Sequence, residues 1–336
     1  MKRTLVALTL AAVWAPPAAP QSPSPVPVGQ DEPVSALPRE GDHRYRLVGK
    51  VRPLLFWIGN NNVGGARLTW QPLDDSGRAL DLLIGADPER APRGVDAWGY
   101  IREEMHGDRA GVFGIRSVND AASLSEAELA LGRDDAAFGV LCAAVGATQA
   151  RAWTTTVIVP RGVSYRHFDR LLDAVASAPR WTSHETTRLP GTAPGFLAAL
   201  DRLISGSVQA ARAGAPHRAA PVRYLYKGGQ YELRLRSEKR IDALTVGKKT
   251  YQRAVRGEFE IGTLATGDTT RFTITYGTIG DLAGVPLRAA YEPRWWLKLE
   301  LALDDDLGVP ADPAADPAML ARIRRACAAA MGEPLS

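Results

Sequence analysis

Residues 51–70 read VRPLLFWIGNNNVGGARLTW, and this stretch decides the fold that the sequence predicts. An apolar run is followed by Gly59-Asn60-Asn61-Asn62 and then by an alternating run that ends at Trp70. Aromatic and β-branched residues are typical of strands, while Asn and Gly tolerate the positive φ of a hairpin turn. The stretch therefore predicts a strand, a turn at 59–62 and a second strand of an antiparallel sheet.

Both halves of the chain repeat this pattern, since apolar residues alternate with polar ones between turn residues. In the first half, strands are expected at 43–52, 66–70, 80–84, 98–101, 112–115, 138–145 and 153–159. In the second half, strands are expected at 231–236, 259–261, 271–276 and 295–303. The last of these is the most regular, because a Trp and four Leu residues occupy every second position.

Helices are expected between the two β-rich parts and at the C-terminus. Apolar residues at helical spacing predict a short helix at 123–131, two helices that begin after Ser164 and Thr192, and a last helix at 317–331. The fold class expected is α+β. One large, curved antiparallel sheet, able to form a half-barrel, is built from both halves, with helices from the middle and the C-terminus covering one face. The single domain at 43–331 comprises β-rich residues 43–160, a helical insertion at 161–214, β-rich residues 221–304 and the last helix.

The first residues predict export. Lys2 and Arg3 precede an apolar run at 4–15, which is too short to cross a bilayer as a helix and is typical of a signal peptide at residues 1–19. Residues 20–42 are rich in proline and predict a disordered linker. No cysteine lies near the cleavage region, so a lipid-anchored form is not expected. The location expected is periplasmic or secreted, with no transmembrane segment after signal removal.

The composition and charge of the chain argue against some classes of binding partner. The net charge is +4, and the basic residues are scattered among acids without a basic run, which argues against nucleic acid. The five histidines stand apart, at 43, 106, 167, 184 and 217, and predict neither a metal site nor a cofactor. Cys142 and Cys327 permit one disulfide in an oxidising compartment; the alternative is that both are small buried residues.

The function remains open between three classes. A half-barrel could hold a lipid or another apolar ligand on its concave side, and the lining residues expected are Trp57, Trp70, Trp98, Trp295 and Trp296. The ordinary alternative is that helices fill that concavity.

An enzyme is the second class: a hydrolase using Asp87, Glu103, Glu104 or His106 near strand ends. Arg90 and Arg93 in the loop DPERAPRG could clamp an anionic ligand, or they could pair with local acids. The third class is an envelope scaffold that binds another protein.

Three short motifs carry a resemblance. Phe56-Trp57-Ile58-Gly59, Val63-Gly64-Gly65-Ala66 and Gly284-Val285-Pro286-Leu287 resemble segments of secreted bacterial β-sheet proteins of unknown function. The resemblance covers about a tenth of the chain. It implies a sheet, but it implies no activity.

Overall fold

The computed structural model of the chain describes residues 40–51, 58–73, 76–87, 89–91, 97–117, 135–163, 167–178, 180–217, 219–294, 297–307 and 316–331. The signal peptide expected at 1–19, most of the linker expected at 20–42 and the helix expected at 123–131 lie outside these residues. So do Ser164, Trp57, Arg93, Trp295 and Trp296.

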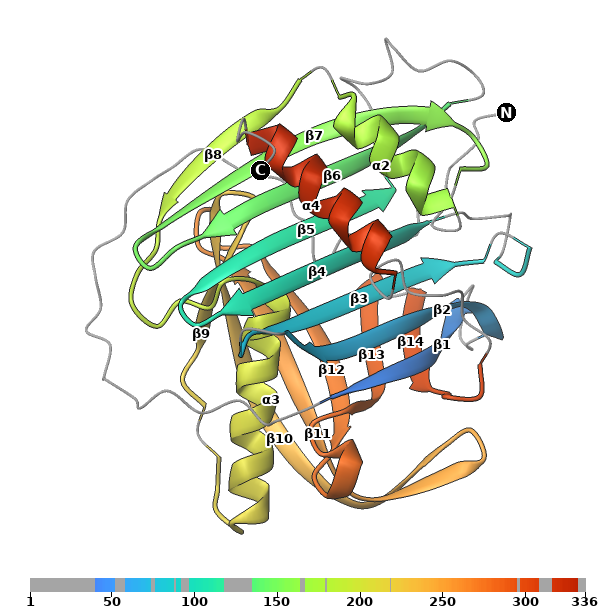
Figure 1. Ribbon diagram of the computed structural model, residues 1–336. Helices are drawn as coiled ribbons and strands as arrows, with labels where there is room; N and C mark the ends of the chain where they lie inside the picture. Colours follow the sequence, from blue (N-terminus) through green and yellow to red (C-terminus); the bar gives the residue numbers. More distant parts are fainter. Residues whose placement is uncertain are drawn as a thin grey trace.

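The first five strands form a meander of antiparallel neighbours (Figure 1). They are β1 (Gly41–Val51), β2 (Ile58–Pro72), β3 (Arg78–Ala86), β4 (Trp98–His106) and β5 (Arg109–Ser117). The turn expected at 59–62 is wrong, because these residues belong to β2 and Ile58 pairs with Val51. The pairing of β1 with β2 shifts between Leu47 and Gly49, so that β2 carries extra residues as a bulge. Asn61 and Asn62 lie in this bulge and not in a turn.

All strands belong to one antiparallel sheet. The others are β6 (Asp135–Val145), β7 (Gln149–Pro160), β8 (Thr182–Thr187), β9 (Val222–Tyr226), β10 (Gly229–Val246), β11 (Lys249–Thr263), β12 (Thr269–Gly277), β13 (Pro286–Arg294) and β14 (Leu297–Leu303). The order across the 14-stranded sheet is β8-β7-β6-β5-β4-β3-β2-β1-β14-β13-β12-β11-β10-β9. The two halves of the chain meet where β1 pairs with β14, with Leu47 opposite Leu301. The expected large sheet built from both halves is confirmed.

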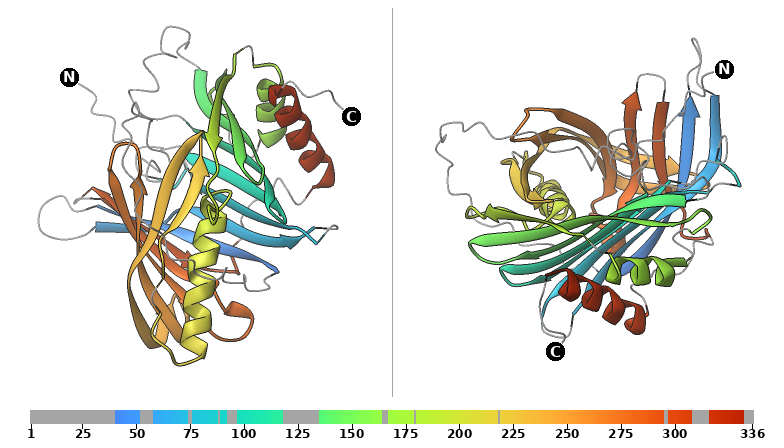
Figure 2. Two further views of the ribbon diagram at one scale, coloured as in Figure 1. Left: turned by 90° about the vertical axis from the view of Figure 1, so that its left-hand side faces the viewer. Right: turned by 90° about the horizontal axis from the view of Figure 1, so that it is seen from above.

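Helices cover both faces of the sheet and not one. α2 (Phe168–Ala176) and α4 (Pro317–Met331) lie on the outer face over β4 to β7, whereas α3 (Phe196–Arg212) lies inside the curl of the sheet (Figure 2). A short 3-10 helix, η4 (Gly280–Leu282), precedes β13. The buried residues of α3 include small ones on several sides of the helix, so this helix must be enclosed by other elements.

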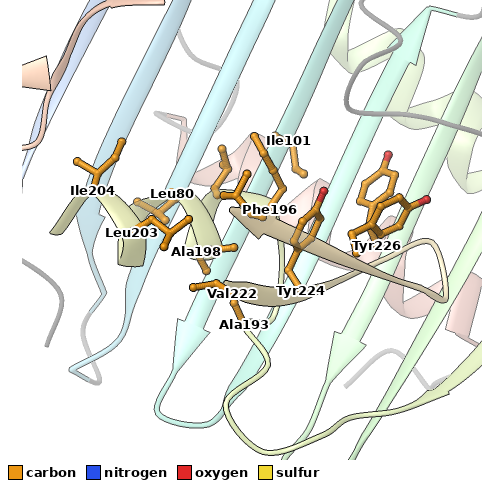
Figure 3. Packing of buried hydrophobic residues seen from close by; sticks show 14 of the residues in the cluster. Leu80, Ile101, Ala193, Phe196, Ala198, Leu203, Ile204, Val222, Tyr224 and Tyr226 are labelled. Atoms are coloured by element: carbon orange, nitrogen blue, oxygen red, sulfur yellow. The ribbon is translucent and has the colours of Figure 1, made fainter. Parts of the chain in front are cut away.

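Alternation along the strands separates two apolar layers. On β4, Trp98 and Tyr100 point to the outer cluster beneath α2 and α4. Ile101 (Figure 3) and Met105 belong to the inner cluster around α3. Because side chains alternate along each strand, the two faces of one sheet contribute to two separate apolar cores.

The two edges of the sheet, β8 and β9, come close without forming a ladder in the described residues. Thr186 Oγ1 donates a hydrogen bond to the Gly228 carbonyl, and Gln230 Nε2 donates to the Thr187 carbonyl at 3.2 Å. The sheet is therefore curled but not closed. β8 lies within the insertion expected to be helical, and its polar sequence, TSHETT, gives no apolar pattern.

The helix α4 is held to the outer face by a disulfide and ion pairs. Cys142 on β6 is bonded to Cys327, with a Cα–Cα distance of 5.4 Å. Arg324 lies 3.1 Å from Glu104 on β4. These contacts anchor a helix of which only Ile323 and Ala326 are buried.

Candidate functional site

The concave side of the sheet is the candidate site. Its three apolar clusters lie around α3 and beside the β1–β14 pair. Leu68 packs against the first and second clusters, and Leu301 packs against the second and third. Both leucines remain partly exposed, so the apolar lining continues between clusters without being fully covered.

Other inward-facing apolar residues are also partly exposed. They share the strand positions that point toward the three clusters, and they are Ile84, Phe272, Ala289 and Tyr291. Ala289 pairs with Leu301 across β13 and β14, and Leu301 pairs with Leu47 across β14 and β1. The lining is a continuous row of apolar residues across neighbouring strands.

A carboxylate from the sheet caps the helix that occupies the concavity. Glu103 on β4 is fully buried, and its two oxygens accept hydrogen bonds from the backbone N–H groups of Leu197 and Ala198, each at 2.9 Å. Gly195 is the N-cap residue and offers no side-chain cap. A Cβ at Gly195 would lie 2.3 Å from Glu103 Oε1, so glycine makes room for the carboxylate. The cap expected from Thr192 is wrong.

Burial dominates the electrostatics of Glu103. Loss of water raises its pKa to about 7, although the two backbone N–H groups and Arg78 act in the opposite direction. Arg78 also pairs with the buried Asp201 of α3 at 2.8 Å. These groups attach the first half of α3 to β3 and β4.

The far half of α3 is fixed by a second polar cluster. The Tyr276 hydroxyl donates to Glu238 at 2.9 Å and lies 2.7 Å from the Ser207 hydroxyl. His217 Nδ1 lies 3.2 Å from the other oxygen of Glu238. Burial acts to raise the pKa of Glu238, but the hydrogen bonds of its neighbours outweigh it and the pKa is lowered. The helix is thus tied to β10 and β12.

A cavity at the N-terminus of α3 is too small for a ligand. Glu103, Leu141, Gly195 and Tyr226 are among its lining residues, and its volume is about 20 Å³. A single water needs about 10–15 Å³ of such a cavity, whereas ligand pockets have volumes of about 300–1,000 Å³. This cavity accommodates one water at most.

Of the tryptophans expected to line the concavity, the two that the structure describes lie on opposite faces of the sheet. Trp70 belongs to the inner cluster around α3, but Trp98 belongs to the outer cluster and lies against Phe138, with ring centroids 5.3 Å apart. Trp57, Trp295 and Trp296 lie outside the described residues. Of the proposed set, Trp98 is misplaced, because its position on β4 points it to the opposite face.

The residues expected for a hydrolase do not converge either. Glu103 points inward, whereas Glu104, its neighbour on β4, points outward to Arg102 and Arg324. Asp87 accepts the N–H of Glu89, and its carboxylate lies 3.3 Å from Arg90, whose side chain is 53% exposed. Arg90 is engaged with a local acid, and Arg93 lies outside the described residues.

Glu104 belongs to a largely buried network of ion pairs and hydrogen bonds on the outer face of the sheet. Arg102 lies 2.5 Å from Asp81 and 2.7 Å from Glu104, and Tyr100 donates to Asp81 at 2.6 Å. Both partners of the Arg102–Asp81 pair are 2% exposed. A buried pair with several hydrogen bonds fixes the orientation of its side chains.

Sequence reasoning missed the cluster of Ser207, His217, Glu238 and Tyr276. These residues are far apart in the chain and carry no motif, so only the pairing of strands with α3 assembles them. Across the part of the chain that the structure describes, no group of three or more His, Cys, Asp or Glu residues could hold a metal ion. In the same residues, the helices are too short or too polar to span a membrane.

Comparisons with known proteins give no family. No family model matches the chain, and no curated protein matches it. Among solved structures, it is similar to a "putative lipoprotein" from Parabacteroides distasonis with a TM-score of 0.25 and 7% identity, over 80% of this chain and 96% of that one. It is also similar to a β-barrel-like protein of a domain of unknown function from Brucella abortus, with a TM-score of 0.34 and 10% identity, over 80% and 98% of the two chains. These descriptions agree with the resemblance to uncharacterised bacterial β-sheet proteins, but at such TM-scores they carry no argument about the site.

Proposed function

We propose that the protein is an exported binding protein that holds a lipid or another apolar ligand against the concave face of its sheet. The observation that carries the proposal is the row of partly exposed apolar side chains that face inward on β2, β3, β12, β13 and β14. Burial of such side chains away from water is favourable by about 25 cal/mol per Å² of apolar surface. An apolar ligand would cover them.

The ligand would lie beside α3 and not beneath it. α3 fills its part of the concavity, and the cavity at its N-terminus has room for about one water. The bound molecule would instead contact Leu68 and Leu301, where the apolar clusters meet. An acyl chain suits this surface, because a flexible chain can follow a row of side chains across strands.

Two adjacent alanines on β13 offer a matched test. Ala289 faces the concave side and packs against the inner cluster, whereas Ala290 pairs with Glu300 and faces outward. Ala289→Trp would place a large ring over the proposed binding surface without adding charge. Ala290→Trp adds the same ring to the outer face.

The experiment is a titration of the purified protein with a fluorescent fatty acid, together with extraction of lipid from protein purified from its host. We expect saturable binding that Ala289→Trp weakens about tenfold, since a filled site excludes the probe, while Ala290→Trp binds like the parent protein. Absence of both saturable binding and extractable lipid would refute the proposal. Equal effects of the two variants would also refute it.

A further inference from the structure

A buried hydroxyl group beside the β1–β14 pair lacks a hydrogen-bond partner. Tyr45 on β1 is 3% exposed, and within the described residues nothing accepts or donates a hydrogen bond at its hydroxyl. Tyr45 belongs to the second apolar cluster, against which Leu68 and Leu301 also pack. A buried phenol usually has a partner for its O–H group. The Tyr45 hydroxyl is therefore a donor that an oxygen atom of a ligand can satisfy.

Asp305, in the turn after β14, lies near this hydroxyl. Burial raises the pKa of Tyr45, and the charge of Asp305 and the Tyr251 hydroxyl act in the same direction. The Asp305 carboxylate lies 3.6 Å from Nδ1 of His43, and its side chain is 42% exposed. A buried donor and a half-exposed acceptor thus lie at the same end of β1.

The cations at this end of the sheet already have acidic partners. The ion pairs are Lys249–Asp306 at 3.3 Å, Arg44–Asp42 at 3.9 Å and Arg46–Asp304. Asp305 itself forms no ion pair with Lys or Arg in the part of the chain that the structure describes. It would repel an anionic head group, whereas an ammonium group would give the Tyr45 O–H no acceptor. A hydroxyl group suits both residues, because it accepts from Tyr45 and donates to Asp305.

A two-stranded ribbon covers Tyr45. Residues 241–252 of β10 and β11 pair with each other and with no other strand among the described residues, and their hairpin projects from the sheet (Figure 1). Its apolar residues belong to the same cluster as Tyr45: Ile241, Leu244, Val246 and Tyr251. A two-stranded hairpin alone is marginally stable in water. This apolar contact and the Lys249–Asp306 pair therefore hold the ribbon down.

The pairing within the ribbon is interrupted at its base. Ile241 pairs with Ala254 and Ala243 with Gln252, but the residues between them do not pair. One of these, Arg253, has a φ of 54°, a left-handed conformation that is unfavourable for a residue with a Cβ. This position is a point about which the ribbon can turn away from Tyr45.

We infer that the ligand of the concave face is an amphiphile with a neutral, hydroxyl-bearing head group, which binds between the Tyr45 hydroxyl and the Asp305 carboxylate. The inference rests on the proposed function, because the acyl chain of this ligand lies on Leu68 and Leu301. The Tyr45 O–H donates to an oxygen of the head group, and a hydroxyl of the head group donates to Asp305. The ribbon opens to admit the head group.

The test compares monolauroylglycerol with laurate, which carry the same acyl chain and differ in the charge of the head group. Each is titrated into the full chain near neutral pH, and binding is measured by calorimetry. Tyr45→Phe removes only the hydroxyl, and Tyr231→Phe, at a buried ring of the cluster around α3, is its control. Asp305→Asn removes the charge and keeps the size, and Asp169→Asn, at an exposed residue of α2, is its control.

We expect the parent protein to bind monolauroylglycerol about tenfold more tightly than laurate, because laurate meets the charge of Asp305. Tyr45→Phe should weaken monolauroylglycerol about tenfold and change laurate less than about twofold, since one net hydrogen bond is worth about a factor of ten. Asp305→Asn should strengthen laurate. Both control variants should bind like the parent protein. Tyr45→Phe should not lower the melting temperature, because the hydroxyl has no partner to lose.

Two kinds of result separate this inference from the proposed function. Equal affinities of the parent protein for the two amphiphiles, tighter binding of laurate, or equal effects of the two tyrosine variants would overturn the inference alone. Absence of binding by both amphiphiles would overturn the proposed function and the inference with it.

Discussion

Glu103 connects two elements that are 94 residues or more apart in the chain, because its carboxylate binds the first N–H groups of α3. Glu103→Ala would leave these buried donors without an acceptor and would open a cavity. We expect the free energy of unfolding to fall by about 2–4 kcal/mol. Chemical denaturation measures this value, and Glu258→Ala, on the exposed outer side of β11, is the control with little effect.

The raised pKa of Glu103 predicts a pH dependence with a definite sign. The ordinary pKa is 4.5 and the folded value is about 7, so between these values the folded state binds the proton and the unfolded state does not. The contribution of Glu103 to the free energy of unfolding is therefore fully present below pH 4.5. It is lost as pH rises toward 7, by an amount on the order of 3 kcal/mol. As pH rises from 4 to 8, the unfolding free energy of the parent protein should therefore fall relative to that of Glu103→Gln, which cannot ionise. A difference that is independent of pH between 4 and 8 would contradict the assignment.

Gly195 is predicted to be essential for the same contact. A methyl group there would meet the Glu103 carboxylate, so Gly195→Ala should destabilise the protein by about 1–3 kcal/mol. Gly111→Ala is the matched control, because a Cβ at Gly111 meets nothing within 4 Å. Thermal melting of the two variants should separate them; equal melting temperatures would show that the cap tolerates a side chain.

At the scale of single residues, the sequence identifies candidate site residues, but it does not predict which face of the sheet each side chain points to. Glu103 and Glu104 were equivalent as acids near a strand end, yet alternation sends them to opposite faces of β4. Trp70 and Trp98 separate for the same reason. The face of each residue depends on the pairing of its strand, which one sequence does not specify.

At the scale of elements, α4 depends on its covalent link. It buries few residues of its own, so loss of the Cys142–Cys327 bond should lower the free energy of unfolding by about 2–4 kcal/mol. Hydrogen exchange should show α4 opening in Cys142→Ala/Cys327→Ala while α3, on the other face, stays protected. Unchanged exchange in α4 would mean that Ile323 and the ion pair of Arg324 suffice to hold it.

Strands with a regular alternation of apolar and polar residues could be predicted from the sequence. Elements that depend on a partner far away in the chain could not. β3, β4 and β14 follow from alternation of Leu, Ile and Trp with polar residues. β8 is polar and is a strand only because β7 pairs with it. The start of α3 is set by Glu103 of β4, so no local capping residue marks it.

At the scale of the molecule, the pairing of β1 with β14 makes one surface out of both ends of the chain. Leu47, Leu301 and Ala289 lie in register across three strands, and this register produces the concave lining. Sequence alternation predicts that such strands share an apolar side, but it does not predict that α3 occupies the concavity. Enclosure of α3 requires the curl of β9 to β12 around it (Figure 2).

The most direct measurement of this architecture is a set of backbone nuclear Overhauser contacts between β1 and β14 in the deuterated protein. The structure predicts contacts in antiparallel register, with Tyr45 opposite Leu303, Leu47 opposite Leu301 and Val51 opposite Leu297. Contacts of β1 with β2 alone, and none with β14, would contradict the single sheet and with it the proposed binding surface.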